Sequence, residues 1–247
     1  MTRLSVNINK IALLRNARGR NYPDVAAFAA RCLDLGAHGI TLHPRPDERH
    51  ARLSDLDELS GLCRQRGAEL NVEGYPSEDF LGAVLRVRPD QCTLVPDQPG
   101  QLTSDHGWDL VGQAGLLAPS VARLAAADIR VSLFVDHDCA HLGAARELGA
   151  HRVELYTEPY AAQHARGTGG HLLGAFRDAA QRAHAAGLGV NAGHDLSLAN
   201  LADFLTIPGI LEVSIGHALI VECLEWGVGE VVPRYLEIVG HAAAALP

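Results

Sequence analysis

Histidines and arginines gather in a short stretch directly after an apolar segment. Within eight positions the sequence carries His43, Arg45, Arg49 and His50, and the four residues before them are Gly, Ile, Thr and Leu. Imidazole groups transfer protons near neutral pH, and guanidinium groups bind anions. When such a loop follows a strand of a parallel sheet, its side chains lie at the edge where ligands bind. We therefore interpret the stretch as one wall of an active site, with a solvated basic loop as the alternative.

Further residues suited to proton transfer or hydrogen bonding end the other apolar segments. They are Asn7, Asn9, Lys10, Glu73, Thr103, Asp136, Glu154, Asn191, His194 and His217. Each has an ordinary explanation when taken alone, because a buried His is usually a hydrogen-bonding group and Asp136 suits a helix N-cap. Their joint occurrence at segment ends instead predicts one shared site in which His and Glu act as acids and bases.

Glycines in the last quarter of the chain favour phosphate binding. The segments Val190–His194 and Val213–His217 both end in Gly-His, and their glycines let the backbone approach an anion closely. These glycines are Gly193 and Gly216, although a tight turn explains each of them equally well. A second positively charged region consists of Arg18, Arg45 and His50. Together the two regions suit a substrate, or a pair of substrates, that carries two phosphates.

Two other uses of these residues stay open. Clustered His and Glu are also metal ligands, and ligands on separate strands would escape a search for His-x-His or His-Glu-x-x-His, neither of which occurs here. Of the 21 basic residues, Lys10 is the only lysine. Its amine could form a Schiff base of the aldolase type, because amines near other cations can become nucleophiles.

Apolar β-branched segments alternate with longer Ala/Leu-rich segments of helical periodicity, and these elements must position the site. The expected strands are Leu4–Asn9, Gly39–His43, Glu69–Glu73, Gln91–Pro96, Arg130–Asp136, Arg152–Thr157, Gly189–Gly193 and Glu212–Gly216. The expected helices are Asp24–Leu35, Ser54–Arg66, Ser77–Val87, Leu116–Ala127, Cys139–Leu148, His171–Ala186, Leu198–Leu205, Ala218–Glu225 and Val231–Ala245. Eight such repeats in 247 residues predict an α/β fold, a (β/α)8 TIM barrel with extra helices. Because no linker interrupts the pattern, residues 1–247 are expected to form a single catalytic domain.

Two connections are longer than is usual between a strand and the following helix. One spans residues 97–115, and the other spans residues 158–170 and ends in Arg-Gly-Thr-Gly-Gly. Both follow expected strands, so both lie at the end of the barrel where the site is expected. We expect a mobile lid there.

Composition limits the class of protein. Hydrophobic residues make up 47% of the chain and charged residues 20%, as in a soluble folded protein. A formal net charge of -8 argues against a nucleic-acid partner, which requires an excess of Lys and Arg. The N-terminal residues lack the apolar run of a signal peptide and no segment is long enough for a membrane span, so we expect a cytoplasmic protein. The five cysteines occur singly and are expected to be buried apolar residues.

Motifs spread in order over nearly the whole chain resemble one known family. They are Val6–Ala12, Leu14–Gly19, Gly39–His50, Asn71–Glu73, Leu94–Pro96, Val131–Asp136, Val190–His194 and Ile215–Ala218. Together they resemble the pyridoxine 5′-phosphate synthases. The resemblance implies a cytoplasmic barrel enzyme of vitamin B6 synthesis that assembles as a homo-octamer. Such an enzyme condenses 3-amino-2-oxopropyl phosphate with 1-deoxy-D-xylulose 5-phosphate to give pyridoxine 5′-phosphate, phosphate and water, without a metal or organic cofactor.

The resemblance also implies roles for individual residues. His43 and Glu73 resemble the family's proton acceptors, His194 its proton donor, and Glu154 a transition-state stabiliser. The positions that match the deoxyxylulose phosphate site are Asn9, Lys10, Arg45, His50 and Thr103. The positions that match the amino-ketone phosphate site are Asn7, Arg18, Asp195, Gly216 and His217.

Two positions depart from the family pattern. Asn9-Lys10 stands where better-known members have Asp-His, which bears on substrate affinity more than on the type of reaction. Asp195 replaces a Gly and puts a negative charge near an expected phosphate site. The alternatives to a synthase are a phosphosugar aldolase or isomerase that uses Lys10, and a barrel that binds phosphorylated metabolites without turnover.

Overall fold

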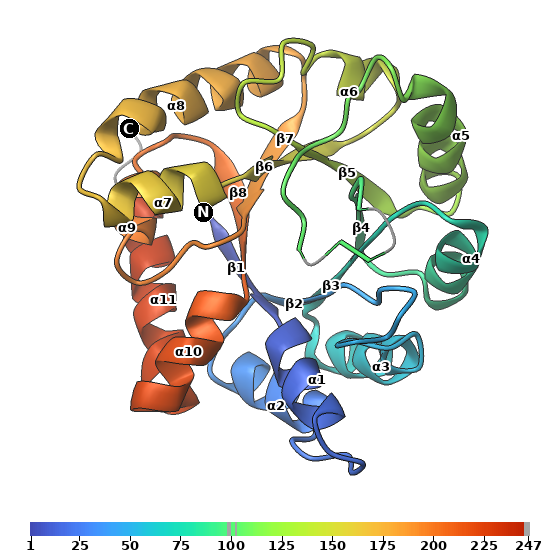
Figure 1. Ribbon diagram of the computed structural model, residues 1–247, viewed down its shortest axis with the longest axis vertical. Helices are drawn as coiled ribbons and strands as arrows, with labels where there is room; N and C mark the ends of the chain where they lie inside the picture. The colour runs from blue at the N-terminus through green and yellow to red at the C-terminus, as the bar shows by residue number, and fades with distance from the viewer. Residues whose placement is uncertain (98–99, 102, 245–247) are drawn as a thin grey trace.

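Eight parallel strands form a closed barrel at the centre of the protein (Figure 1). The computed structural model describes residues 1–97, 100–101 and 103–244. The strands are β1 (Arg3–Asn7), β2 (Gly39–Leu42), β3 (Glu69–Gly74), β4 (Gln91–Leu94), β5 (Arg130–Val135), β6 (Arg152–Tyr156), β7 (Gly189–Gly193) and β8 (Ile210–Ile215). Each strand pairs in parallel with the next, and β1 closes the barrel against β8, where Leu4 lies opposite Val213. The predicted (β/α)8 barrel is therefore confirmed.

Helices surround the barrel and cover its outer surface (Figure 1). They are α1 (Asn9–Asn16), α2 (Val25–Asp34), α3 (Asp55–Arg66), α4 (Glu78–Val87), α5 (Ala114–Ala125), α6 (Ala144–Glu147), α7 (Glu158–Ala165), α8 (Gly170–Ala185), α9 (Leu201–Phe204), α10 (His217–Trp226) and α11 (Val228–Ala244). Several begin and end with the expected signals. Asp24 and Ser77 cap the N-termini of α2 and α4 through their side chains, and Gly67 ends α3 in the left-handed conformation.

Two of these helices were not predicted. Helix α1 begins at Asn9, within the residues expected to continue the first strand, and Ile11, Ala12 and Arg15 are its buried side. Helix α7 occupies part of the expected loop at 158–170, because Pro159 in the first turn favours a helix start and Tyr160 is buried. The second expected connection is therefore largely helical. Of the two long loops from which a lid was predicted, only the one at 97–115 still supports that prediction.

Other bounds differ in smaller ways. The expected helices Cys139–Leu148 and Leu198–Leu205 shorten to the single turns α6 and α9. A register shift between β7 and β8 lets β8 begin at Ile210, before the expected start. The expected lid segment 97–115 includes residues 98, 99 and 102, and the expected last helix includes residue 245; these four lie outside the described residues.

Polar side chains fill much of the interior of the barrel and bond across it. The Thr93 hydroxyl donates to Asn71 Oδ1 at 3.0 Å, and the Gln91 amide donates to Glu212 Oε1 at 3.3 Å, all four residues being buried. Because side chains alternate along a strand, intervening residues such as Leu4 and Val6 face the helices and form the apolar core. The barrel therefore presents hydrogen-bonding groups beneath any site at its rim.

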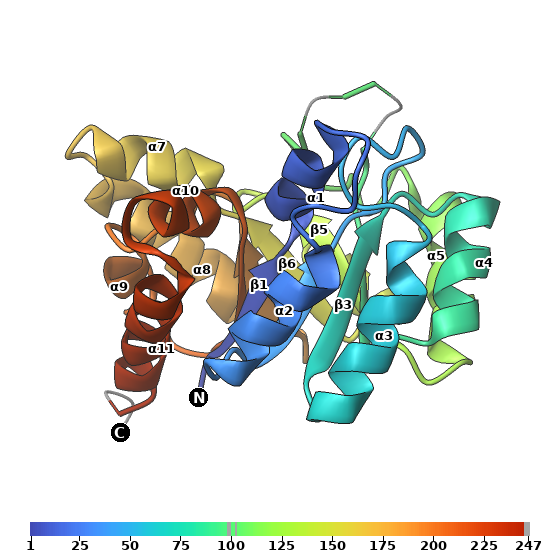
Figure 2. The same ribbon diagram turned by 90° about the horizontal axis from the view of Figure 1, so that it is seen from below.

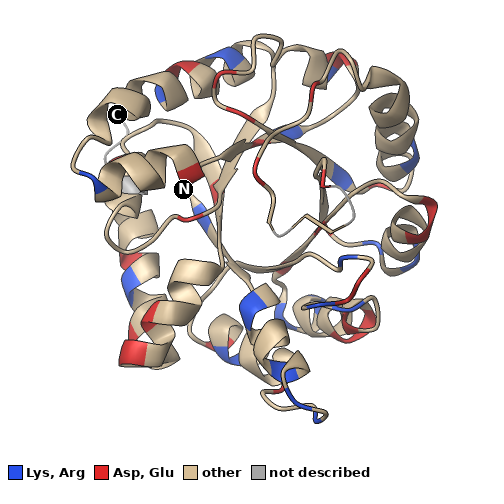
Figure 3. Cartoon of the chain, in the orientation of Figure 1, with Lys and Arg blue, Asp and Glu red and all other residues tan. Residues whose placement is uncertain are grey.

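The two ends of the barrel differ. The N-terminus lies at the end where the strands begin, whereas α1 and the loops that follow the strands lie at the opposite end (Figure 2). Acidic and basic residues are interspersed over the outer helices (Figure 3). Among the described helices, none combines the length and apolar character that crossing a bilayer requires.

Candidate active site

A cavity of about 380 Å³ opens at the carboxyl ends of the strands. Its wall contains Asn7, Asn9, Lys10, His43, Arg45, His50, Glu73, Thr103, Ser104, Glu154, His194, Asp195, Ser214, Gly216 and His217. Every residue to which the family resemblance assigned a role is among them except Arg18. Strands far apart in the sequence therefore bring the expected acids, bases and cations to one place. Four other residues expected at the site are not part of this wall: Arg49, Asp136, Asn191 and Gly193. Asp136 accepts from the Gly107 N–H at 2.9 Å, and the buried Asn191 amide donates to Gln91 Oε1 at 3.3 Å.

His43 and Glu73 lie next to each other at the ends of β2 and β3. His43 Nδ1 is 3.9 Å from Glu73 Oε2, and Asn9 Oδ1 fixes the His43 backbone by accepting from its N–H at 2.9 Å. Burial, followed by the charge of Arg45, holds the pKa of His43 well below its ordinary value. Burial, followed by the carboxylate of Asp97, raises the pKa of Glu73 to about 8. At neutral pH both groups are mainly uncharged, so their contact is not an ion pair.

Glu154 lies deeper, on β6. Its Oε2 is 3.5 Å from the Thr93 hydroxyl, and a Cβ at residue 193 would come within 2.4 Å of its Oε1. A side chain at residue 193 would therefore displace this carboxyl group from its present position. Burial, followed by the neighbouring Glu73, raises the pKa of Glu154 well above its ordinary value. This shift favours the protonated form of Glu154, which can donate a hydrogen bond.

His194 follows β7 directly and faces the cavity from the other side. Its ring lies 5.0 Å from the Phe134 ring and 5.3 Å from the Tyr156 ring, centroid to centroid. Burial is the main cause that lowers the pKa of His194, and the charge of Asp195 opposes it. The free imidazole is therefore neutral near pH 7. An anion in the cavity would raise its pKa and favour the protonated form.

The start of α10 forms one side of the cavity. Helix α10 begins at His217 directly after Gly216, has no acidic residue in its first turn, and has no side-chain cap on its N–H groups. A Cβ at residue 216 would lie 3.1 Å from Asn7 Cβ, so glycine allows this close approach. Free N–H groups at a helix N-terminus bind phosphate. The side is thus suited to a phosphate ester.

Cationic groups line another part of the cavity. Arg45 is buried, and its guanidinium forms an ion pair with Asp97. The pKa of His50 falls to about 4, mainly through burial and then through the charge of Arg45. Arg45, Lys10 and neighbouring Arg49 therefore keep this side positive without a proton on His50. A second dianion would be stabilised there.

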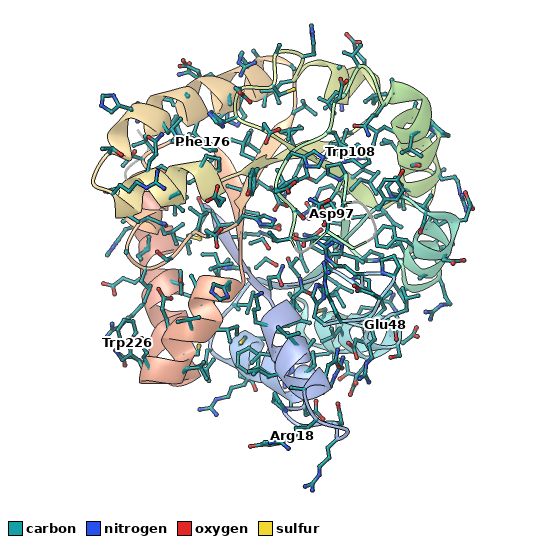
Figure 4. The ribbon with its side chains drawn as sticks, viewed as in Figure 1. Arg18, Glu48, Asp97, Trp108, Phe176 and Trp226 are labelled. Carbon is teal, nitrogen blue, oxygen red and sulfur yellow. The ribbon has the colours of Figure 1, made fainter. Side chains whose placement is uncertain are left out.

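Arg18 lies away from the cavity. It is exposed on the segment after α1 and points outward at the periphery of the molecule (Figure 4). The structure does not bring it to the other site residues, because α1 directs the chain away from the rim. Its assignment to the amino-ketone phosphate stays a prediction. Thr103 and Asp195 do line the cavity, the first as an exposed loop residue.

Three polar residues at the site were missed. Ser104 and Ser214 line the cavity, and buried Asp97 bonds both Arg45 and the Ser104 hydroxyl, the latter at 2.8 Å. Asp97 Oδ1 has no hydrogen-bond partner within the described residues. Asp97 could have been found because it comes directly after the expected strand Gln91–Pro96. Ser214 could have been found because it precedes Gly216 by two residues, and residues two apart in a strand lie on the same face. Nothing in the sequence pattern singled out Ser104.

The fold and the cavity define a class of protein: a (β/α)8 barrel with a cavity at the carboxyl ends of its strands that is lined by imidazole, carboxyl and cationic groups. Among the described residues, no His, Cys, Asp and Glu side chains form a group of three that could hold a metal ion, so we assign no metal ligand.

Residues 4–241 match the family model described as "Pyridoxal phosphate biosynthesis protein PdxJ", and the chain belongs to this family. It is 53% identical to the pyridoxine 5′-phosphate synthase of Xanthomonas axonopodis pv. citri, over 98% of this chain and 99% of the relative. It is 51% identical to the enzyme of the same name from Mesorhizobium japonicum, over 96% of this chain and 98% of the relative. The resemblance stated from the motifs is thereby confirmed.

Solved structures of lower identity share the barrel. The 3-keto-L-gulonate-6-phosphate decarboxylase of Vibrio cholerae matches with a TM-score of 0.66 at 11% identity, covering 100% of this chain and 99% of that one. The thiamine phosphate pyrophosphorylase of Pyrococcus furiosus matches with a TM-score of 0.63 at 15% identity, covering 98% and 96%. At such identities the likeness shows the fold alone.

Proposed function

We propose that this protein is a pyridoxine 5′-phosphate synthase, which condenses 3-amino-2-oxopropyl phosphate with 1-deoxy-D-xylulose 5-phosphate and releases phosphate and water. One observation carries the proposal: His43, Glu73 and His194 line a single cavity. The same cavity also contains the cationic Lys10 and Arg45 and the uncapped N-terminus of α10. The names of the relatives, at about half identity over nearly the whole chain, agree with this reaction. Residues 1–247 act in it as one catalytic domain.

Proton transfer is the work of the buried acids and bases. Neutral His43 accepts a proton from carbon or oxygen, because its pKa is too low for it to be charged beforehand. Glu73, with a pKa of about 8, both takes and returns protons near neutral pH. The raised pKa of Glu154 favours its protonated form, which donates a hydrogen bond to oxygen that becomes negative in the transition state.

Binding of two dianions brings the reacting carbons together. An imine between the two substrates then forms as an intramolecular reaction, which lowers the entropic part of the barrier. The negative charge of the bound phosphates also raises the pKa of His194 and prepares it to donate a proton to the leaving group. No enzyme amine takes part in the imine.

The substrates occupy different sides of the cavity in this proposal. The deoxyxylulose phosphate contacts Asn9, Lys10, Arg45, His50 and Thr103. The amino-ketone phosphate contacts Asn7, Asp195, Gly216 and His217, with Arg18 as a further contact. The free N–H groups at the start of α10 support the second assignment, and the buried guanidinium of Arg45 supports the first.

A direct assay tests the function. Purified protein is mixed with both substrates, and the ultraviolet absorption of the pyridine product is followed over time. Appearance of product only when both substrates are present supports the synthase. Borohydride reduction separates it from an aldolase: covalent capture of substrate on Lys10 would contradict the scheme. Binding of both substrates with no product would indicate a non-catalytic barrel.

We also propose a cytoplasmic homo-oligomer, with the octamer implied by the family. Exposed apolar side chains on the neighbouring helices α1 and α10 support association. They are Leu13 and Leu14 on α1 and Val221, Leu224 and Trp226 on α10. Exposed apolar patches of this kind commonly mark protein interfaces. Light scattering of the eluting protein measures the number of subunits.

A further inference from the structure

The backbone at His194 has an unusual conformation. The φ angle is +84° at His194 and +57° at Asp195. Residues with a Cβ rarely adopt this left-handed region, and two in succession persist only where surrounding contacts hold them. The turn formed by residues 193–195 connects β7 to the cavity wall, and it determines where the imidazole of His194 points.

Thr157 holds the first part of this turn. It is fully buried, directly follows β6, and is not part of the cavity wall. Its backbone N–H donates to the Gly193 carbonyl at 2.9 Å. Its hydroxyl lies 2.6 Å from that carbonyl oxygen and 2.5 Å from the His194 carbonyl oxygen, and it shares its one proton between them. The peptide groups on both sides of the His194 Cα are therefore fixed from β6.

Asn200 holds the second part of the turn. Its amide NH₂ donates to the Asp195 carbonyl at 3.1 Å, and its amide oxygen accepts from the Ser197 N–H at 2.9 Å. Asn200 is itself 5% exposed, and its backbone carbonyl accepts from the buried Tyr160 hydroxyl at 2.9 Å. Asn200 thus connects the turn to α7 through its backbone carbonyl, and it stands directly before α9.

The direction of the His194 ring depends on this backbone. The ring packs against Phe134 and Tyr156, which leave it little freedom while the turn keeps its shape. If φ at residue 194 returned to an ordinary negative value, the side chain would leave these aromatic neighbours and point away from the cavity. Any group that holds φ positive therefore also holds the imidazole in place.

We infer that Thr157 and Asn200 are positioning residues for this reaction: their hydrogen bonds to the carbonyls of residues 193–195 hold the left-handed turn that directs His194 into the cavity. The inference rests on the proposed role of His194 as proton donor. The hydrogen bonds matter more in this chain because residue 195 is Asp. A glycine there would adopt positive φ without a steric cost, whereas Asp must be held in it.

The first test removes the hydroxyl and keeps its shape. We expect Thr157→Val to lower kcat by about tenfold or more while both KM values stay within about twofold, because the substrate contacts are intact and only the proton donor is displaced. Thr157→Ser should restore most of kcat. Asn200→Asp, which loses the donor to the Asp195 carbonyl, should act in the same direction. Thr206→Val is the matched control, since that exposed hydroxyl donates to the Asp203 carbonyl at 2.7 Å, away from the cavity.

The second test asks whether backbone conformation is the cause. Glycine at position 195 adopts positive φ without a steric cost, so Thr157→Val should reduce kcat by a smaller factor in an Asp195→Gly background than in the wild type. An equal factor in both backgrounds would overturn the inference, as would a Thr157→Val protein with wild-type kcat. Both rates are referred to the folded fraction, so a loss of stability alone does not imitate the result.

A measurement without substrates separates the inference from the proposed function. The pKa of His194, lowered by burial, is followed by NMR of the imidazole nitrogens. It should rise toward its ordinary value in Thr157→Val as the ring becomes hydrated, and it should stay unchanged in Thr206→Val. If wild-type protein makes no pyridoxine 5′-phosphate but the pKa moves as expected, the proposed function fails and the positioning of His194 stands. An unmoved pKa contradicts the positioning.

Discussion

At the scale of single residues, burial determines which groups in the cavity carry a proton. His43 and His194 have lowered pKa values, and Glu73 and Glu154 have raised ones, with desolvation as the largest cause in each case. Burial therefore favours the uncharged forms of these four acid–base groups, and the cationic side chains of Arg45 and Lys10 line the same cavity. Such an arrangement favours proton transfer in both directions with little reorganisation.

Glu73→Gln tests the role of the carboxyl group with the pKa of about 8. We expect kcat to fall by about 10²-fold to 10⁴-fold, because an amide has no proton-accepting oxygen of comparable basicity. In the wild type kcat/KM should rise with pH through this pKa, and the rise should vanish in the variant. Steady-state rates across the pH range measure both. Glu78→Gln, an exposed carboxylate on α4, is the control. A variant with normal turnover would remove Glu73 from the base role.

His43→Ala separates catalysis from binding. We expect turnover to fall by about 100-fold or more, with the affinity for each substrate alone changed far less, because the phosphate contacts come from other residues. Calorimetric titration gives the affinities, and the product assay gives the rate. His171→Ala, on the exposed start of α8, should match the wild type in both. Equal losses in affinity and rate would instead indicate that His43 only holds substrate.

The sequence predicted most of the cavity wall, and the reasons for its failures are physical. A residue at the end of a strand must lie at the rim, so His43, Glu73 and His194 could be found from the periodicity of the strands alone. The direction of a residue in a loop is not set by periodicity. Arg18 was therefore assigned to a cavity that it does not reach here, and Asp97 was overlooked although it bonds Arg45. Glu212, buried in the barrel below the site, was also not singled out.

At the scale of elements, helix α1 anchors the loop that carries the cations. Buried Arg15 forms an ion pair with Asp55 at the start of α3 at 2.6 Å and donates to the His50 carbonyl at 3.1 Å. Asn16 adds a bond to the same carbonyl at 2.8 Å. Two helices and the intervening loop thus hold one another, which keeps His50 at the cavity.

Arg15→Met tests this anchor. We expect it to lower the free energy of unfolding by about 3–5 kcal/mol, because Asp55 is left without its partner inside the protein. The double variant with Asp55→Leu should recover part of the loss, since no unpaired charge remains. Denaturant unfolding measures both, and the KM for the deoxyxylulose phosphate should rise in the single variant. If the losses in free energy of unfolding of the two single variants simply add in the double variant, the two side chains do not stabilise each other.

Elements with a strong pattern were predicted, and those without one were not. The strands are short β-branched segments ended by glycine turns, so their order and their number could be predicted. Helix α1 follows β1 almost directly, so no turn residue marks its start. Its buried side is also narrow, which makes the helical periodicity weak. Helix α7 lies before a glycine-rich stretch that indicated a loop.

At the scale of the whole molecule, the carboxyl groups inside the barrel make stability depend on pH. Burial raises the pKa values of Glu73, Glu154 and Glu212. Between the ordinary Glu pKa of 4.5 and the Glu73 value of about 8, the unfolded chain has lost a proton that the folded protein keeps. Raising the pH over this interval therefore favours unfolding, by up to about 1.4 kcal/mol per pH unit for each such group.

We accordingly expect lower stability at about pH 9 than at about pH 6, with Glu154→Gln reducing the difference because glutamine stays neutral throughout. Thermal unfolding at a series of pH values gives the comparison. Glu78→Gln again serves as the control, because that side chain is mostly exposed and should leave the pH dependence as it was. A flat profile for the wild type would show that the buried carboxyls ionise without cost.

The number of repeats predicted that the barrel closes. The polar character of its interior could not be predicted in the same way. The strands alternate small polar and apolar residues, and this order does not tell which set faces the interior and which set faces the helices.

Both ends of the described chain lie on the side of the molecule away from the rim, at the start of β1 and the end of α11 (Figure 2). A tag, a surface linker or a fluorescent reporter joined to either end would therefore leave the mouth of the cavity uncovered. The protein can be immobilised through its termini with the catalytic face turned toward the flowing solution.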